Sequence, residues 1–228
     1  SQNCWPSVEF DIGAINNFLK SFFPAGFYYK TFMWPKSFWY RVYEPFIRKA
    51  AGLGVGSTEK DKERYEHKYE YCDLLVTGSG PSGLASAYAA AKSGAKVILA
   101  EDKPRFGGSL LTDDVNIDNL SGKQWADKII SELKEMPNVT LKNRSQVFGY
   151  YDHNMLVMFE RTGDHLEKKS KYTPRQRLWY IRAKEVLLSS GSIERPIVFG
   201  NNDTPGIFLA SAAKEYMKVY GVVVGKKP

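Results

Sequence analysis

One short segment constrains the fold of this chain more than any other. Residues 74–83 read Leu-Leu-Val-Thr-Gly-Ser-Gly-Pro-Ser-Gly and join an apolar run, typical of a buried parallel strand, to a helix. In a turn of this kind Gly78 permits the tight bend, Gly80 lets the backbone approach a pyrophosphate, and Gly83 allows the helix to pack closely on the strand. The helix N-terminus offers unpaired N–H groups to the anion, and Pro81 in its first turn has no N–H to satisfy. We therefore predict a dinucleotide site here.

The residues after the turn support this prediction. Small residues continue the helix up to Gly94, and residues 96–100 form a second apolar strand that Glu101 closes. An acidic side chain at that position can accept hydrogen bonds from a ribose 2′-OH. It would also repel a 2′-phosphate, which argues against NADP. The positive charges of Lys103 and Arg105, which follow closely, weaken that argument. The alternative is a glycine-rich turn in some other α/β protein, but here strand, turn, helix, strand and acid all occur together.

A glycine pair, Gly107 and Gly108, follows the acid. In flavoproteins with two dinucleotides such a pair gives the backbone a second close approach to the cofactor; otherwise it is a flexible turn. The motif fits NAD or FAD, and we predict NAD, with FAD as the alternative. No acid, base, nucleophile or metal-ligand constellation stands out. The predicted cofactor-binding residues are Gly78, Ser79, Gly80, Pro81, Ser82, Gly83, Glu101, Asp102, Arg105, Gly107, Gly108, Ser109, Val147 and Gly191.

Composition limits the classes of protein to which this chain can belong. The 228 residues are 43% hydrophobic and 25% charged, as in an ordinary soluble globular protein, and no apolar run is long enough to span a bilayer. No secretory signal opens the chain. The two cysteines, Cys4 and Cys72, give no disulfide framework or metal motif and are compatible with the cytoplasm, where we expect the protein. The net charge of +7 is spread along the chain without a recognition motif, so we predict neither nucleic-acid nor membrane binding.

Aromatic residues concentrate before the glycine motif. Residues 18–46 hold 13 of the 32 aromatic side chains, and Pro24-Ala25-Gly26 interrupts any long helix there. So dense a stretch must cover another part of the chain or a partner, because exposed patches of that size are rare on soluble monomers. Residues 37–51 are predicted to be helical, with Gly52 as the cap.

The remaining pattern predicts an α/β domain. Residues 59–70 form a charge-rich run, predicted to be a solvated linker. We therefore predict an aromatic-rich connector arm with its linker at 1–70 and a dinucleotide-binding domain, incomplete at its C-terminus, at 71–228. The order of elements fits a layered FAD/NAD(P)-binding fold of the glutathione-reductase type, with a parallel sheet and an antiparallel β-meander. The further predicted elements are a helix at 124–136, a strand at 139–141, a hairpin of 147–151 and 155–159 about 152–154, strands at 178–182 and 185–189, and a helix at 207–219.

Several motifs match one family. They run from Asn3-Cys4-Trp5-Pro6-Ser7 through the aromatic stretch to Gly191 with Glu194-Arg195-Pro196. On these residues the chain resembles the α subunit of heterotetrameric sarcosine oxidase, although related amine dehydrogenases, opine dehydrogenases and hydrogen cyanide synthases share parts of the pattern. One departure is Ser189-Ser190-Gly191-Ser192, where the family has Ala-Thr-Gly-Ala. The other matching segments are 23–32, 34–35, 43–54, 148–153, 175–183 and 199–206.

The resemblance implies oxidative demethylation of sarcosine to glycine, with oxygen reduced to peroxide and the one-carbon unit passed to tetrahydrofolate. It further implies NAD bound by the α subunit, FAD in the β subunit, FMN held covalently at the α/β interface, and β, γ and δ subunits as partners. This part of the protein is then expected to be inactive alone. Two alternatives stay open. One is the FAD-binding domain of a flavin-dependent reductase or of an amine or opine dehydrogenase; the other is a subunit in which the nucleotide is only a structural brace.

Overall fold

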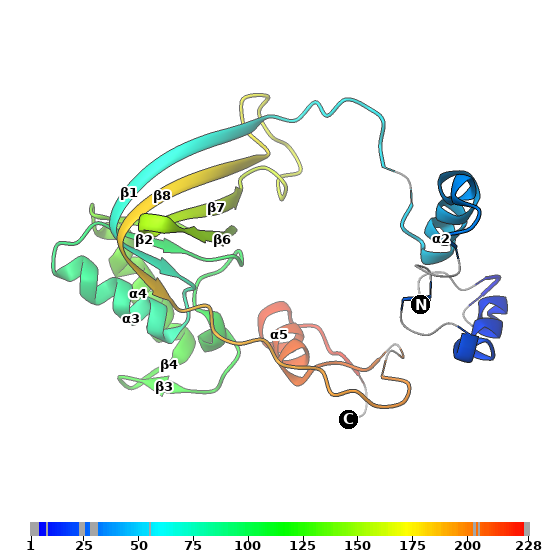
Figure 1. The fold of residues 1–228 in the computed structure, drawn as a ribbon. Helices are drawn as coiled ribbons and strands as arrows, with labels where there is room; N and C mark the ends of the chain where they lie inside the picture. Colours follow the sequence, from blue (N-terminus) through cyan, green and yellow to red (C-terminus); the bar gives the residue numbers. More distant parts are fainter. Residues whose placement is uncertain are drawn as a thin grey trace. The chain divides into compact units, whose positions relative to one another are not determined.

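The computed structural model describes residues 5–7, 9–22, 26–27, 32–54, 56–202, 204 and 206–225. The chain forms two compact units, the arm unit (Ser1–Asp61) and the sheet unit (Lys62–Pro228) (Figure 1). This boundary comes before the predicted one at residue 70, because part of the charged run joins the sheet. Among the helices of the described ranges, none is both long and apolar enough to cross a membrane.

The arm unit is built from short helical elements. Gly52 ends the last of them with a φ of 68°, and its N–H donates toward the carbonyl oxygens of Arg48 and Lys49, which confirms the predicted cap. The predicted helix at 37–51 is divided among three successive elements, and Pro24 and Ala25 lie outside the described residues. The elements are the 3₁₀ helices η1 (Ile12–Asn17), η2 (Lys20–Phe22) and η3 (Lys36–Phe38), the π-helical η4 (Trp39–Tyr43) and α2 (Glu44–Ala51).

The sheet unit contains a six-stranded sheet in the order β5–β2–β1–β8–β7–β6. The first four of these strands pair in parallel, whereas β8, β7 and β6 form an antiparallel meander. Helices α3 (Pro81–Lys92) and α4 (Gly122–Glu135) lie together on one side of the parallel strands (Figure 1). The predicted layered α/β fold is therefore confirmed. The strands are β1 (Tyr65–Thr77), β2 (Val97–Ala100), β5 (Val139–Lys142), β6 (Ser145–Tyr151), β7 (Met155–Arg161) and β8 (Gln176–Leu188), with a separate hairpin of β3 (Asn116–Ile117) and β4 (Leu120–Ser121).

Two apolar clusters hold the layers together. The first packs α3 and α4 on the parallel strands and includes Leu84 and Trp125. The second joins the parallel strands to the meander and includes Met158. Successive residues of a strand point to opposite faces, so Val76 belongs to the first cluster and Leu75 to the second. Each fully buried side chain of this size contributes about 1.5–3 kcal/mol, and β1 is therefore stabilised from both sides.

Local sequence explains two elements that were predicted correctly. Helix α4 begins with a capping box, in which the Ser121 hydroxyl accepts a hydrogen bond from the Gln124 N–H and the Gln124 side chain accepts one from the Ser121 N–H. The hairpin of β6 and β7 turns at η6 (Asp152–Asn154), where His153 and Asn154 have φ values of 58° and 50°. Both residue types adopt the left-handed region more readily than most. Helix α5 (Ala210–Tyr220) and strand β5 also lie where the sequence predicts a helix and a strand.

Two predictions about the long strands were wrong. Residues 65–70 begin β1 and are not a linker; their charges are compensated because Glu66 and Glu70 form ion pairs with Arg177 and Lys96 at 2.9 and 2.8 Å. The two strands predicted at 178–182 and 185–189 are one strand, β8. Its pairing with β1 runs along the whole of both strands, and this supplies hydrogen bonds where the apolar pattern of the sequence is interrupted.

Candidate dinucleotide-binding site

The glycine turn joins β1 to α3 as predicted. Gly78 has a φ of 96°, and its N–H donates to the carbonyl oxygen of Ala100 at the end of β2, 2.8 Å away. A Cβ at Gly78 would lie 2.3 Å from the carbonyl oxygen of Ser189, and a Cβ at Gly83 would lie 2.0 Å from the carbonyl oxygen of Gly78. Real Cβ atoms essentially never come so close to a backbone atom. The packing of the chain on itself therefore requires both glycines.

Gly80 differs from these two glycines. It precedes α3 with an ordinary extended backbone, at φ −67° and ψ −175°. No atom of the described residues outside its immediate neighbours lies within 4 Å of the Cβ that an alanine would carry there. Neither backbone strain nor packing requires a glycine at this position. The space beside Gly80 is instead open, next to the helix start whose N–H groups can bind an anion.

A second glycine loop packs against the turn. The N–H of Gly107 donates to the carbonyl oxygen of Ser79 at 3.1 Å and to the hydroxyl of Ser79 at 3.0 Å. Gly108 has a φ of 53°, and a Cβ there would lie 2.8 Å from the Cα of Gly80. The sequence predicts that this glycine pair brings the backbone close to a cofactor. In the structure, the pair brings the backbone of its loop close to the glycine turn. Contact of the pair with a cofactor stays a prediction.

Glu101 ties the same turn to the end of β2. Its side chain is only 8% exposed. One carboxylate oxygen accepts hydrogen bonds from the N–H and the hydroxyl of Ser79, at 3.0 and 2.5 Å, and the other accepts one from the N–H of Lys103 at 2.9 Å. A carboxylate has about four acceptor sites, so capacity remains for one ribose hydroxyl. The acid lies where the motif requires, and its bond to a ribose stays a prediction.

The other predicted residues lie at several places in the sheet unit. Pro81 and Ser82 begin α3 and are exposed. Val147 packs on the cluster between the parallel strands and the meander, which also contains Ala100. Asp102 follows Glu101 but turns its carboxylate to Arg161, 2.6 Å away. Arg105 and Ser109 are exposed on the loop that carries the glycine pair, and Gly191 is exposed beyond the end of β8.

Ser189, which the sequence analysis did not select, is the residue after β8 that reaches the turn. Its N–H donates to the carbonyl oxygen of Thr77 at 2.8 Å, and its own carbonyl oxygen lies against Gly78. No atom of the described residues outside the immediate neighbours lies within 4 Å of a Cβ at Gly191. The available signal was topological: parallel strands that are neighbours end at one edge of the sheet, so the residue directly after β8 meets the residue directly after β1.

Glu194, part of the motif that carries the family resemblance, stabilises a helix. Its carboxylate accepts a hydrogen bond from the N–H of Ser211 in the first turn of α5, at 2.8 Å. The hydrogen bonds of Ser211, from its side chain and its N–H, lower the pKa of Glu194. The ion pair of Lys103 with Glu215, at 2.8 Å, then attaches α5 to the loop after β2. Glu194 thus stabilises the start of α5, and the Lys103–Glu215 pair places this helix beside the loop after β2.

Two titratable groups whose pKa values are shifted by burial, Cys72 and Lys142, lie away from the turn. Burial raises the pKa of the Cys72 thiol to about 12, and this side chain belongs to the second apolar cluster. Burial also lowers the pKa of Lys142, whose Nζ lies 4.0 Å from the ring centroid of Trp179. Within the described ranges, no group of three or more His, Cys, Asp and Glu side chains is arranged to hold a metal ion.

The chain is similar to several known proteins in sequence and in fold. Residues 73–161 match the family described as FAD dependent oxidoreductase. Sarcosine oxidase subunit alpha of Rhizobium meliloti (strain 1021) is 48% identical over 228 residues, which are 100% of this chain and 23% of that protein. The subunit of the same name from Corynebacterium sp. (strain U-96) is 41% identical over 179 residues, 78% of this chain and 18% of that protein. The crystal structure of L-proline dehydrogenase from P. horikoshii superposes with a TM-score of 0.57 at 24% identity, covering 75% of this chain and 33% of that one.

Residues 73–161 of the sheet unit thus match a domain of the FAD-dependent oxidoreductase type, and the superposition supports its layered fold. The similarity to the α subunit of sarcosine oxidase extends over the full chain, which confirms the resemblance predicted from the sequence motifs. The chain spans less than a quarter of the length of these curated relatives.

Proposed function

We propose that the sheet unit binds the ADP part of a dinucleotide at the turn Gly78–Gly83. The observation that carries this proposal is the contrast among the glycines. Packing within the chain explains Gly78, Gly83 and Gly108, whereas Gly80 has an ordinary backbone and open space beside it. A pyrophosphate in that space would explain the remaining glycine, because its oxygens could approach the N–H groups at the start of α3 without meeting a side chain.

The adenosine ribose would lie at Glu101. Its carboxylate is held by Ser79 and Lys103 and keeps capacity for one more hydrogen bond. Ser79, which belongs to the turn, donates two of the hydrogen bonds that hold this carboxylate. A ribose bonded to Glu101 and a pyrophosphate beside Gly80 would therefore be fixed relative to one another. Binding would thus require little rearrangement of the turn, which favours affinity.

We propose NAD as the dinucleotide. The chain is similar to sarcosine oxidase subunit alpha, and we infer that this subunit binds NAD. FAD is the second candidate. It is favoured by the description of the matched family, FAD dependent oxidoreductase, and by the glycine pair at Gly107 and Gly108. Both share the ADP part, so the geometry of the turn suits either.

The whole protein, in this proposal, is an oxidase of sarcosine. It would convert sarcosine to glycine with formation of peroxide, and would transfer the one-carbon unit to tetrahydrofolate. This chain would belong to the α subunit, with β, γ and δ subunits as partners, FMN at an interface with a partner, and the cytoplasm as its location. It would supply binding and orientation and leave the redox chemistry to cofactors.

The test is to purify the native protein with the chains that accompany it, denature it and identify the released nucleotide by mass spectrometry. Release of NAD in proportion to this chain is the expected result. Release of FAD in that proportion, with no NAD, would replace the first candidate by the second. A protein that carries neither and binds neither on titration would contradict the proposed function. Sarcosine-dependent peroxide formation, measured on the same preparation, tests the activity separately.

A further inference from the structure

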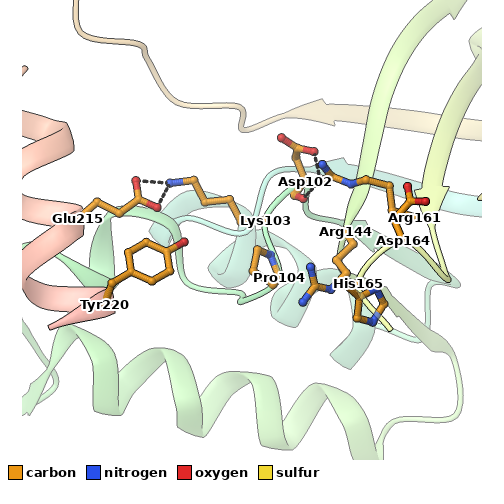
Figure 2. Close-up of a pocket in the computed structure, with 9 residues that line it drawn as sticks. All are labelled: Asp102, Lys103, Pro104, Arg144, Arg161, Asp164, His165, Glu215 and Tyr220. Atoms are coloured by element: carbon orange, nitrogen blue, oxygen red, sulfur yellow. Dashed lines mark hydrogen bonds and ion pairs between the residues drawn. The ribbon is translucent and has the colours of Figure 1, made fainter. Parts of the chain in front are cut away.

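A second site lies on the sheet unit, beside the loop that follows Glu101. It is a pocket of about 390 Å³, a size suited to a small ligand. Its walls come from the loop at 102–104, from Arg144 between β5 and β6, from the end of β7 with Asp164 and His165, and from α5 (Figure 2). The glycines of the dinucleotide turn are not part of its lining.

The acidic side chains of this pocket are already paired. Asp102 pairs with Arg161 at 2.6 Å, and Glu215 pairs with Lys103 at 2.8 Å. The third acid, Asp164, accepts hydrogen bonds from the side chains of Arg175 and Gln176, at 2.5 and 2.9 Å. The lining therefore has no acidic group left to neutralise a further cation.

Arg144 is that further cation. Among the described residues, it takes part in none of the ion pairs or side-chain hydrogen bonds. Figure 2 draws its guanidinium group at the same end of the pocket as the imidazole ring of His165. A guanidinium group presents a planar fork of N–H donors that matches the oxygens of a phosphate or carboxylate. Three acids and three cations line the pocket, and because Asp164 is paired with Arg175 from outside the lining, Arg144 offers its donors without an acidic partner.

The backbone of Arg144 gives an independent indication. Six described residues other than glycine have a positive φ, and five of them are Asn, Asp or His, which tolerate it. Arg144, at φ 52°, is the exception. Its N–H donates to Lys103 O at 3.1 Å, and its carbonyl oxygen accepts the N–H of Arg161 at 3.0 Å, so both walls of the pocket hold it in place. Strained residues fixed in this way are concentrated at functional sites.

We propose that this pocket binds an oxyanion, a phosphate or carboxylate group, through Arg144 and His165. The group could belong to a separate small molecule or to the 2′-phosphate of a dinucleotide held at the neighbouring turn. The binding chemistry is the same in both cases. This site goes beyond the proposed function, because neither the Gly80 space nor sarcosine oxidation requires it.

Inorganic phosphate is the first probe, titrated into the native protein by calorimetry. Saturable binding is expected. Arg144→Asn removes the guanidinium group and retains a residue type that accepts a positive φ, so affinity should fall about tenfold or more while the melting temperature is maintained. His165→Ala, at an exposed position, should weaken binding without affecting the fold. Lys128→Gln is the matched control: it removes one positive charge from an exposed site on α4 and should leave the affinity within about twofold.

Titrations with NAD and NADP distinguish the two sources of the oxyanion. Tighter binding of NADP than of NAD, with the difference lost in Arg144→Asn, assigns the pocket to a 2′-phosphate. Equal binding of both, with phosphate still bound in the presence of saturating NAD, assigns it to a separate small anion. Gly80→Val should abolish dinucleotide binding and leave phosphate binding intact, so failure of either site is seen separately. Absence of saturable phosphate binding, or equal loss in Arg144→Asn and Lys128→Gln, would overturn the proposal.

Discussion

The two units of this chain use apolar residues in opposite ways. In the sheet unit, strands and helices place alternate or periodic residues on shared faces, and two closed clusters result. In the arm unit, aromatic residues are denser, yet none of the described side chains is buried. Trp34, Tyr40 and Phe46 are 83%, 82% and 73% exposed. Hydrophobic content alone therefore does not produce a core; regular elements long enough to share a face do.

The contrast also separates the roles that we propose for the two units. The apolar side chains of the sheet unit pack against one another within the unit. Open space remains beside Gly80, and this space suits a small ligand. The arm unit leaves large aromatic side chains uncovered, and such side chains dominate the energy of protein contacts. We therefore propose the arm unit as a contact surface for partner chains.

Deletion of residues 1–58 from the complete protein should have the largest effect. β1 begins at Tyr65, so the sheet unit keeps all its strands, and its melting temperature should change by no more than a few degrees. Co-purification with partner chains should be lost. Tyr40→Ala should weaken assembly, whereas Tyr172→Ala, an exposed tyrosine of the sheet unit, should not. A truncated protein that assembles normally would contradict the role of the arm, and one whose sheet unit unfolds would mean that the aromatics pack on their own chain.

Gly83→Ala should destabilise the sheet unit through packing alone, since this glycine has no positive φ. The new Cβ would lie 2.0 Å from the carbonyl oxygen of Gly78, a backbone atom that cannot move cheaply. Overpacking of this kind costs about 1–3 kcal/mol, occasionally more. Ser82→Ala is the control, because Ser82 is an exposed neighbour on the same helix and should change stability by about 0.5 kcal/mol or less. Urea unfolding gives both values; equal midpoints for the two variants would contradict the packing argument.

Glu101→Ala should weaken dinucleotide binding by about 1–3 kcal/mol, because a charge-assisted hydrogen bond to the ribose is lost. The turn also loses the acceptor of Ser79, so part of the effect is structural. Glu101→Gln keeps one acceptor oxygen and should lose less. Calorimetric titration of both variants is the measurement. An unchanged affinity in Glu101→Ala would show that Glu101 does not contribute to dinucleotide binding.

The smallest effect concerns alkaline pH. The folded-state pKa of Cys72, raised by burial to about 12, lies above the value of the unfolded chain. The stability that it contributes is complete below the unfolded pKa and is lost as pH rises toward the folded value, by up to about 1.4 kcal/mol per pH unit. The native protein should therefore lose about 1–2 kcal/mol more than Cys72→Ala between about pH 8 and pH 10. Parallel slopes in unfolding titrations would contradict the burial of this thiol.

Much of the sheet unit could be predicted because its signals are local. The glycine turn, the helix predicted at 124–136 and the hairpin at Asp152–Asn154 each depend on a few neighbouring residues. The start of β1 and the continuity of β8 could not be predicted in this way. Their polar residues are compensated by distant partners, such as Arg177 for Glu66, and by hydrogen bonds between strands more than a hundred residues apart in sequence.

The same difference between local and long-range signals applies to the residues of the candidate site. Gly78, Gly80, Gly83 and Glu101 lie together as the motif requires, because the motif itself spans strand, turn, helix and strand. Ser189 was missed since its approach to Gly78 follows from the pairing of β8 with β1, which no short pattern encodes.

The most direct measurement is the nucleotide content of the purified protein carrying Gly80→Val, beside that of Gly200→Val. Both glycines have room for a Cβ and neither has a positive φ, so both variants should fold with native melting temperatures. We expect native and Gly200→Val protein to retain one dinucleotide for each copy of this chain, and Gly80→Val to retain essentially none, with affinity reduced at least about a hundredfold, equivalent to about 2.7 kcal/mol. A folded Gly80→Val protein that retains its full complement of dinucleotide would show that the nucleotide is bound elsewhere.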